Sequence, residues 1–245
     1  MKNFCLTMHD GGAMYPNTDA ARLRSLEVAL VKSERISPQD LAFNQVTLMK
    51  LKKVIILFKQ GLDTHQKTYI KRVNANKEYQ KAFKKSKLYL SHFIQVFNFS
   101  ILRNEIPKMD RKLYNIHVND SKVPEMNTET ELVEWGTKIL EGEKQRLAKG
   151  GNPIYNPKIA VVRLEFEKFL KHYNSQNTFK HSHEFSIEKL IELRKNVDNV
   201  ILDIWNQVEA FFSAYSDTEK RERAESYGVK YVLRKKEKLM REFNG

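Results

Sequence analysis

The sequence predicts a mainly α protein, a helical bundle built from two tandem helical hairpins, and three observations support this prediction. The chain of 245 residues contains only nine glycines and six prolines, so few positions interrupt a helix. Apolar residues recur at three- and four-residue steps, which is the period of an amphipathic helix. Capping-box sequences at 128–131 and 216–219 indicate two helix starts.

The clearest helical pattern lies at 196–215. Its apolar stripe consists of Val197, Val200, Ile201, Ile204, Trp205, Val208, Phe211 and Phe212. The capping box at 216–219 then begins a short helix, which is expected to end at Tyr227 and Gly228 because glycine permits a left-handed residue there. The residues that follow, 229–233, favour a β-strand.

The segment 1–36 is expected to hold a loop or tail at 1–17, where Gly11, Gly12 and Pro16 oppose a helix, and then a short helix at 18–32. The segment 37–120 is predicted to form the first, strongly basic hairpin repeat. Its first helix starts at Ser37 and Pro38 and is expected to reach about Val73.

The middle of that helix, 54–58, is apolar on every side, and the alternative of a buried strand is less favoured because its flanks have helical spacing. A break at 74–76 is expected to lead to a second, antiparallel helix over about 76–104. One side of this helix carries the apolar residues Tyr79, Phe83, Leu90, Phe93, Ile94, Phe97 and Ile101. Beyond Pro107, a helical turn is expected at 108–113 and a β-prone piece at 114–118.

The segment 121–155 is predicted to be a crossover helix that runs from the capping box to about Lys149 and ends at Gly150 and Gly151. The segment 156–245 is predicted to be the second hairpin repeat. It starts at Asn156 and Pro157, has a polar loop or frayed turn at 174–183, and continues from Glu184 or Ser186 into the long stripe.

The two hairpins are interpreted as an internal repeat. In each one an apolar helix end, a charged break and a short basic turn precede an aromatic-led, β-prone piece, with 111–116 aligning on 224–229. If the repeat holds, 114–118 and 229–233 are expected to pair as one small two-stranded ribbon.

This pattern resembles a group of uncharacterised bacterial all-helical proteins with tandem helical hairpins. The residues that carry the resemblance are 205–212, 227–232, Gly142, Glu143, Arg146 and 150–153. The resemblance implies an all-helical fold over most of the chain after about Ser37, and it implies no activity.

Composition favours a soluble protein of the cytoplasm. Hydrophobic residues make up 41% of the chain, enough for a core, and no apolar run approaches the roughly 18 residues of a membrane span. The first residues lack an apolar stretch typical of a signal peptide. The single cysteine, Cys5, excludes an internal disulfide, and we interpret it as a plain terminal residue rather than a nucleophile.

The net charge of +13 is concentrated at 37–120, where 16 Lys and Arg face six Asp and Glu. Candidate polyanion-binding residues are Lys77, Lys81, Lys84, Lys85, Lys50, Lys52, Lys53, Lys71 and Arg72. The alternative is a solvated helix face, yet few acidic residues stand one helical turn from these lysines. Because Lys outnumbers Arg, binding to nucleic acid is expected to be only weakly sequence-specific.

Other chemistry has weaker signals. His181 and His183 stand two positions apart, which points them away from each other on a helix, so metal binding is not favoured. The row Glu184, Glu188 and Glu192 is interpreted as solvated rather than as an acid/base pair. No catalytic constellation and no phosphate-binding glycine loop are visible, so no cofactor is expected.

The predicted function is a non-catalytic binding or scaffold protein that contacts nucleic acid or an acidic protein surface through the basic first hairpin. The alternative is a structural or assembly protein that acts by self-association or by helix–helix contact with a partner. A metal-dependent enzyme is the third hypothesis.

Overall fold

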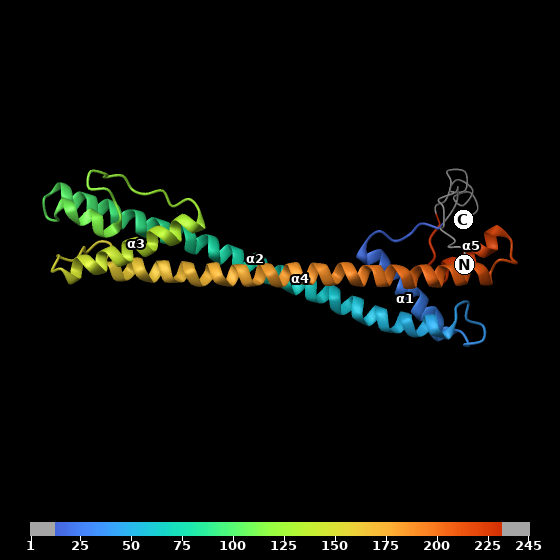
Figure 1. Cartoon of the computed structure of the whole chain (residues 1–245). Coiled ribbons are helices and arrows are strands. Elements are labelled where there is room, and N and C mark those ends of the chain that lie inside the picture. The colour runs from blue at the N-terminus through green and yellow to red at the C-terminus, as the bar shows by residue number, and fades with distance from the viewer. Residues whose placement is uncertain (1–12, 232–245) are drawn as a thin grey trace. The chain divides into compact units, whose positions relative to one another are not determined.

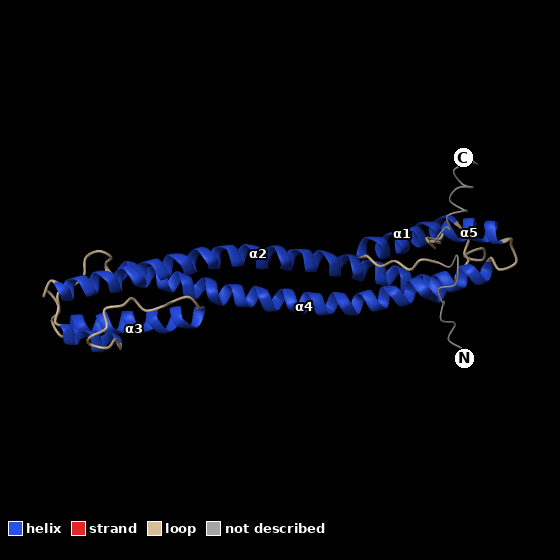
Figure 2. Cartoon of the chain, turned by 90° about the horizontal axis from the view of Figure 1, so that it is seen from above, coloured by secondary structure: helices blue, strands red, loops and turns tan. Residues whose placement is uncertain are grey.

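The computed structural model describes residues 13–231, and over this range the chain is mainly α, as predicted. The helices of the described residues are α1 (Asp19–Arg35), α2 (Gln45–Leu102), the 3-10 helix η1 (Lys108–Tyr114), α3 (Glu129–Ala148), α4 (Ile159–Phe211) and α5 (Asp217–Glu225). Figure 1 shows their order along the chain, and Figure 2 shows helices and loops without strands between residues 13 and 231. Cys5 and residues 232–233 of the predicted ribbon lie outside the described residues.

The chain divides into two compact units. The first unit consists of 1–67 and 185–245, of which 13–67 and 185–231 are described, and the second unit consists of 68–184. The long helices α2 and α4 each contribute residues to both units. The predicted segments 37–120, 121–155 and 156–245 do not coincide with these units, and as sequence repeats they stay a prediction.

The core of the first unit brings α1, α2, α4 and the residues after α5 together. Its buried residues include Leu26, Ala29, Leu51, Val54, Phe58, Val197, Ile201, Ile204, Trp205, Val208, Tyr227 and Val229. The stripe predicted at 196–215 is thus the α4 side of this core, and 54–58 is helical, as expected. Arg22 and Arg194 of this unit pair with Asp198 at 2.6 Å and with Asp19 at 2.7 Å, respectively.

The core of the second unit combines α2, η1, α3 and α4. Its buried residues include Tyr79, Leu90, Phe93, Ile94, Phe97, Tyr114, Leu132, Ile139, Val162, Phe166 and Phe169. The α2 side is the apolar face predicted for 76–104. At Gly142 of α3, an added Cβ would lie 2.7 Å from the Leu113 carbonyl oxygen, so glycine is needed for this close helix contact.

The ends of η1 and α5 share one capping motif. Ile116 N–H donates to Arg111 O and Asn115 N–H to Lys112 O, while Val229 N–H donates to Ala224 O and Gly228 N–H to Glu225 O. Asn115 and Gly228 have the positive φ values, 57° and 88°, that this helix end requires. A buried tyrosine precedes each of them, Tyr114 or Tyr227.

The predicted breaks inside the long helices are wrong. Residues 74–76 lie within α2 and 174–183 lie within α4, so 37–73 and 76–104 do not form an antiparallel hairpin. Neither stretch contains glycine or proline. Relative to alanine, asparagine lowers the stability of a helix by only about 0.7 kcal/mol per residue. A polar composition therefore did not interrupt helices whose two ends are held in separate cores.

The helix starts were predicted with mixed success. Thr128 and Glu131 form a complete capping box at α3, and the Ser216 hydroxyl accepts from Glu219 N–H at α5, so both starts are confirmed. The start at Ser37 is wrong, because Ser37 forms a turn and α2 begins after Asn44, whose side chain accepts from Thr47 N–H at 2.8 Å. Leu41 and Phe43 are buried ahead of that cap.

The predicted ribbon is absent from the described part of the chain. Residues 114–118 form the end of η1 and a turn, and the bridges seen within 13–231 are isolated ones, Ala13 with Tyr231 and Tyr155 with Lys158. The left-handed Asn115 turns the backbone away from an extended path.

Candidate polyanion-binding surface

Four predicted lysines lie on the solvent side of α2 in the second unit. At 100° per residue, Lys77, Lys81, Lys84 and Lys85 fall opposite the buried face that contains Tyr79, Leu90 and Phe97. All four are exposed. The face predicted from the sequence is therefore present as a surface feature of this unit.

Acidic partners reduce the positive charge of this face. Lys81 pairs with the exposed Glu78 at 2.9 Å, a contact that contributes little to stability because solvent screens it. Lys85 contacts Glu165 of α4 at 3.2 Å, and Lys168 contacts the same carboxylate at 2.9 Å.

The Lys85 contact has a structural role. The Glu165 side chain is only 7% exposed, and although burial alone would raise its pKa, the hydrogen bonds from Lys168 and Lys85 lower it. A buried carboxylate needs such partners, so Lys85 supports the packing of α4 and is a weak candidate for a partner contact.

The other five predicted residues do not join this face. Lys50, Lys52 and Lys53 belong to the first unit, where Lys50 pairs with Asp203 at 3.7 Å. Lys50, Lys53 and Asp203 line a groove of about 510 Å³ together with Asn196 and Asn199.

Lys71 and Arg72 belong to the second unit, but helical geometry directs them roughly 100° or more away from the middle of the lysine face. Six of the nine predicted residues have no ion pair among residues 13–231: Lys52, Lys53, Lys71, Arg72, Lys77 and Lys84.

The charge around this face is strongly one-sided. Residues 68–87 of α2 contain seven Lys and Arg and one acidic residue, Glu78. The second unit as a whole has 21 Lys and Arg against 13 Asp and Glu, a net charge of +8. No residue of α2 between 59 and 78 is buried. The charged side chains of this stretch therefore stay hydrated when the protein folds, and folding pays no desolvation cost for them.

The histidines do not form a metal centre in the described chain. His181 is exposed and contacts Glu184 at 3.3 Å, whereas His183 is buried with its Nδ1 3.3 Å from the Thr68 hydroxyl. The helix thus directs the two rings apart, as their spacing predicted. Between residues 13 and 231, no group of three or more His, Cys, Asp or Glu side chains could hold a metal ion.

Two buried arginines in the second unit were not recognised as candidates from the sequence. Arg146 of α3 donates from Nε to Glu143 Oε2 at 2.8 Å and from Nη2 to Glu143 Oε1 at 2.8 Å and to Asn152 O at 2.7 Å. The Tyr114 hydroxyl donates to the same carboxylate. Burial and the hydrogen bond to Glu143 raise the pKa of Tyr114 far above its usual range, so it remains a donor at any physiological pH.

Arg111 of η1 is the other buried arginine, and its partners are neutral. Its Nε and Nη2 donate to Asn98 Oδ1 at 3.3 and 3.0 Å, and its Nη1 donates to Val118 O at 2.8 Å. The signal for Arg146 was present in the sequence as Gly142, Glu143 and 150–153, which mark the resemblance. Arg111 is not among the residues of that resemblance, and arginine is normally a surface residue.

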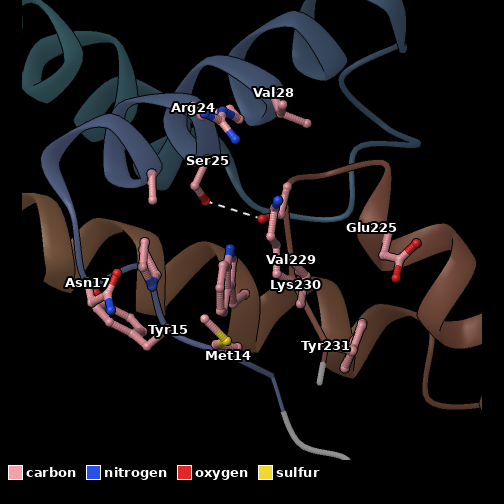
Figure 3. Close-up of a pocket in the computed structure, with 14 residues that line it drawn as sticks. Met14, Tyr15, Asn17, Arg24, Ser25, Val28, Glu225, Val229, Lys230 and Tyr231 are labelled. Atoms are coloured by element: carbon pink, nitrogen blue, oxygen red, sulfur yellow. Dashed lines mark hydrogen bonds between the residues drawn. The ribbon is translucent and has the colours of Figure 1, made fainter. Parts of the chain in front are cut away.

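The first unit contains a cavity of about 540 Å³ (Figure 3). It is lined by residues of α1, by Trp205 of α4, by the segment 14–17 before α1, and by the end of α5 with the residues that follow it. Tyr15 and Trp205 contribute apolar surface with their rings 5.8 Å apart, and the Ser25 hydroxyl donates to Gly228 O at 3.3 Å. Arg24, Lys230 and Glu225 bring charges of both signs, so the lining does not indicate one class of ligand.

Among residues 13–231, no helix is long and apolar enough to cross a membrane.

Comparison with known proteins adds no assignment to these sites. Neither a protein-family model, nor a curated protein, nor a solved structure matches the chain.

Proposed function

We propose that this chain is a non-catalytic binding protein whose second unit contacts a polyanion through α2. The observation that carries the proposal is the segment 68–87, where seven cationic residues face one acidic residue. Lys77 and Lys84 are the best candidates for contact because both are exposed and have no ion pair among the described residues. Nucleic acid, without sequence preference, is the expected polyanion, because lysines act as point charges and not as bidentate readers of bases.

The test is the salt dependence of binding to double-stranded and single-stranded nucleic acid. Each phosphate neutralised on B-DNA contributes about −0.9 to the slope of log K against log salt, so Lys77→Gln with Lys84→Gln should reduce the slope by about 1.8. Between 50 and 200 mM salt, that change corresponds to roughly a tenfold smaller loss of affinity.

A matched control keeps the total charge equal. Lys112→Gln with Lys122→Gln removes two exposed lysines of the same unit that lie outside α2 and should leave most of the slope intact. Lys85 is left unchanged in both variants, because it holds the buried Glu165. Absence of binding by the unaltered chain at low salt, or equal slopes for both variants, would refute the proposal.

A second function, helix–helix assembly, is favoured by a different observation. Val46, Met49, Ile56 and Leu57 are 56%, 64%, 57% and 40% exposed, and helical geometry places them on the side of α2 opposite the first-unit core. Exposed apolar stripes of this kind mark interaction surfaces. Met49→Glu with Ile56→Glu should shift the sedimentation coefficient to that of a monomer, and Leu88→Glu in the second unit should not. A chain that is monomeric at high concentration would remove the self-association form of this hypothesis.

We also propose that the tandem repeat takes a revised form, with α1–α2–η1 as one repeat and α3–α4–α5 as the other. Each has a short helix, a long helix and a second short helix in the same order. The shared motif at 111–116 and 224–229, which the sequence alignment had paired, supports this revision. In each unit the motif packs against the short helix that begins the other repeat, with Tyr114 near Gly142 of α3 and Gly228 near Ser25 of α1.

A further inference from the structure

Arg111 is a buried cation whose charge no carboxylate neutralises. The residue is 3% exposed, and no Asp or Glu between residues 13 and 231 lies within ion-pair distance of it. Arg146, buried to 2% in the same unit, shows the ordinary arrangement, since Glu143 meets it with two oxygens. Buried charges are normally paired because desolvation of an unpaired ion is costly, so Arg111 is an exception that calls for a reason.

The helix end itself does not require an arginine at this position. Residues 224–229 make the same capping hydrogen bonds as residues 111–116, and the position equivalent to Arg111 is occupied by Ala224, which is fully buried. The motif therefore forms without a cation. What Arg111 adds in the second unit is a guanidinium held in one orientation by Asn98 and Val118.

Arg111 is one of the residues that line a cavity of suitable size and charge. A pocket of about 590 Å³ is lined by Arg111, Lys108, Asn104, Asn119, Ser121 and Glu105, together with the apolar Ile101, Leu102, Ile106 and Pro107. Pockets for small ligands usually measure about 300–1,000 Å³. Glu105 does not neutralise this lining, because Arg103 already binds its two oxygens at 2.7 and 3.0 Å.

The orientation of Arg111 is fixed before any ligand arrives. Asn98 is itself held by a hydrogen bond from its Nδ2 to Ser121 O at 3.0 Å, so the acceptor that positions Arg111 cannot turn away. Lys108 supplies a second cation from the exposed rim, and Asn104, Asn119 and Ser121 supply neutral polar side chains. A preorganised guanidinium with a nearby ammonium is the arrangement that recognises an oxyanion.

We infer that this pocket of the second unit binds a small oxyanion, with phosphate the preferred group, against Arg111 and Lys108. The site is separate from the lysine face of α2 and does not depend on the polyanion proposal. The apolar residues of the lining, Ile101, Leu102, Ile106 and Pro107, accommodate the uncharged body of a phosphate-bearing small molecule.

The test uses the full chain and inorganic phosphate as the probe, at ionic strength held constant with sodium chloride. Binding is measured by isothermal titration calorimetry and by the shift of the thermal transition. We expect one site per chain, no binding after Arg111→Gln, and at least a threefold weaker affinity after Lys108→Met. Lys112→Met is the matched control, because Lys112 is exposed on the same η1 and does not line the pocket.

Acetate in place of phosphate distinguishes the two oxyanion classes, and tighter binding of acetate would reassign the ligand to carboxylates. No saturable phosphate binding, or equal affinity in Arg111→Gln and the unaltered chain, would overturn the inference. If Arg111→Gln does not fold by circular dichroism, Lys108→Met against Lys112→Met decides the matter, since both positions are exposed. Equal affinities for these two variants would then count against the site.

Discussion

The buried Arg146–Glu143 pair gives the sharpest stability prediction for the second unit. Arg146 and Glu143 are 2% and 1% exposed and share two hydrogen bonds of 2.8 Å. Arg146→Met leaves the Glu143 carboxylate buried without its counter-ion, so we expect it to cost about 3–5 kcal/mol. The Asn152 carbonyl also loses its donor.

The double variant Arg146→Met with Glu143→Leu separates the charge from the packing. It removes both ions. The Asn152 carbonyl lacks its donor in both variants, and the further cost in the double variant is that of the Tyr114 hydroxyl, which loses its partners, at about 1–3 kcal/mol. The double variant should therefore be more stable than the single variant. As an exposed control, Arg103→Met breaks the pair with Glu105 and should leave the free energy of unfolding nearly unchanged.

The two tryptophans make the assay specific for each unit. Trp135 belongs to the second unit and Trp205 to the first, and the chain has no others. Urea unfolding followed by fluorescence in a Trp205→Phe background therefore reports the second unit alone. If the double variant is as unstable as Arg146→Met, the cost does not arise from an unpaired buried carboxylate and the reasoning is refuted.

Two further predictions concern the stability of α2 at 74–76 and the ion pair of Asp19 in α1. Asn74→Ala with Asn76→Ala should raise the free energy of unfolding by about 0.7 kcal/mol per residue, measured by urea unfolding, because both positions are exposed inside one helix. A loss of stability would favour the break predicted from the sequence. The hydrogen bond from Arg194, with Arg22 nearby, lowers the pKa of Asp19 below its usual 3.8. Asp19 therefore stabilises the first unit above that pH and loses the effect as the pH falls through the folded-state pKa. In a Trp135→Phe background, where Trp205 fluorescence reports the first unit, Asp19→Asn should be less stable than the unaltered chain at pH 7 and equally stable in strong acid. Parallel curves of stability against pH would contradict this linkage.

The local signals of the sequence predicted the local parts of the fold. The sequence predicted the capping boxes at α3 and α5 and the apolar stripe of α4, because each pattern lies within a few consecutive helical turns. The continuity of α2 through 74–76 was missed because no local pattern indicates it. One end of α2 packs in the core of the first unit and the other end in the core of the second unit, and both cores include residues distant in the sequence. Propensity of two asparagines is too weak to decide such a question.

The candidate sites were predictable only where the chemistry faces solvent. The lysine face follows from helical spacing, but the partner of Lys85 is Glu165, on another helix and 80 positions later in the chain. Arg111 and Arg146 were not predicted as buried site residues, because arginine lies at the surface in most proteins. Asn98, a polar residue among the buried residues of α2, was a signal that a buried polar partner was required.

The positive charges of the second unit differ in what they cost the fold. Lys77 and Lys84 lie on an exposed side of α2 and are free to be replaced without loss of packing. Lys85 holds a buried carboxylate, so its replacement changes stability and binding together. Arg111 carries a desolvation cost that neither an acid nor the capping motif explains, since Ala224 serves the same motif. A charge retained at such a cost is expected to act on something outside the chain, whereas the exposed lysines need a binding measurement before the same conclusion applies to them.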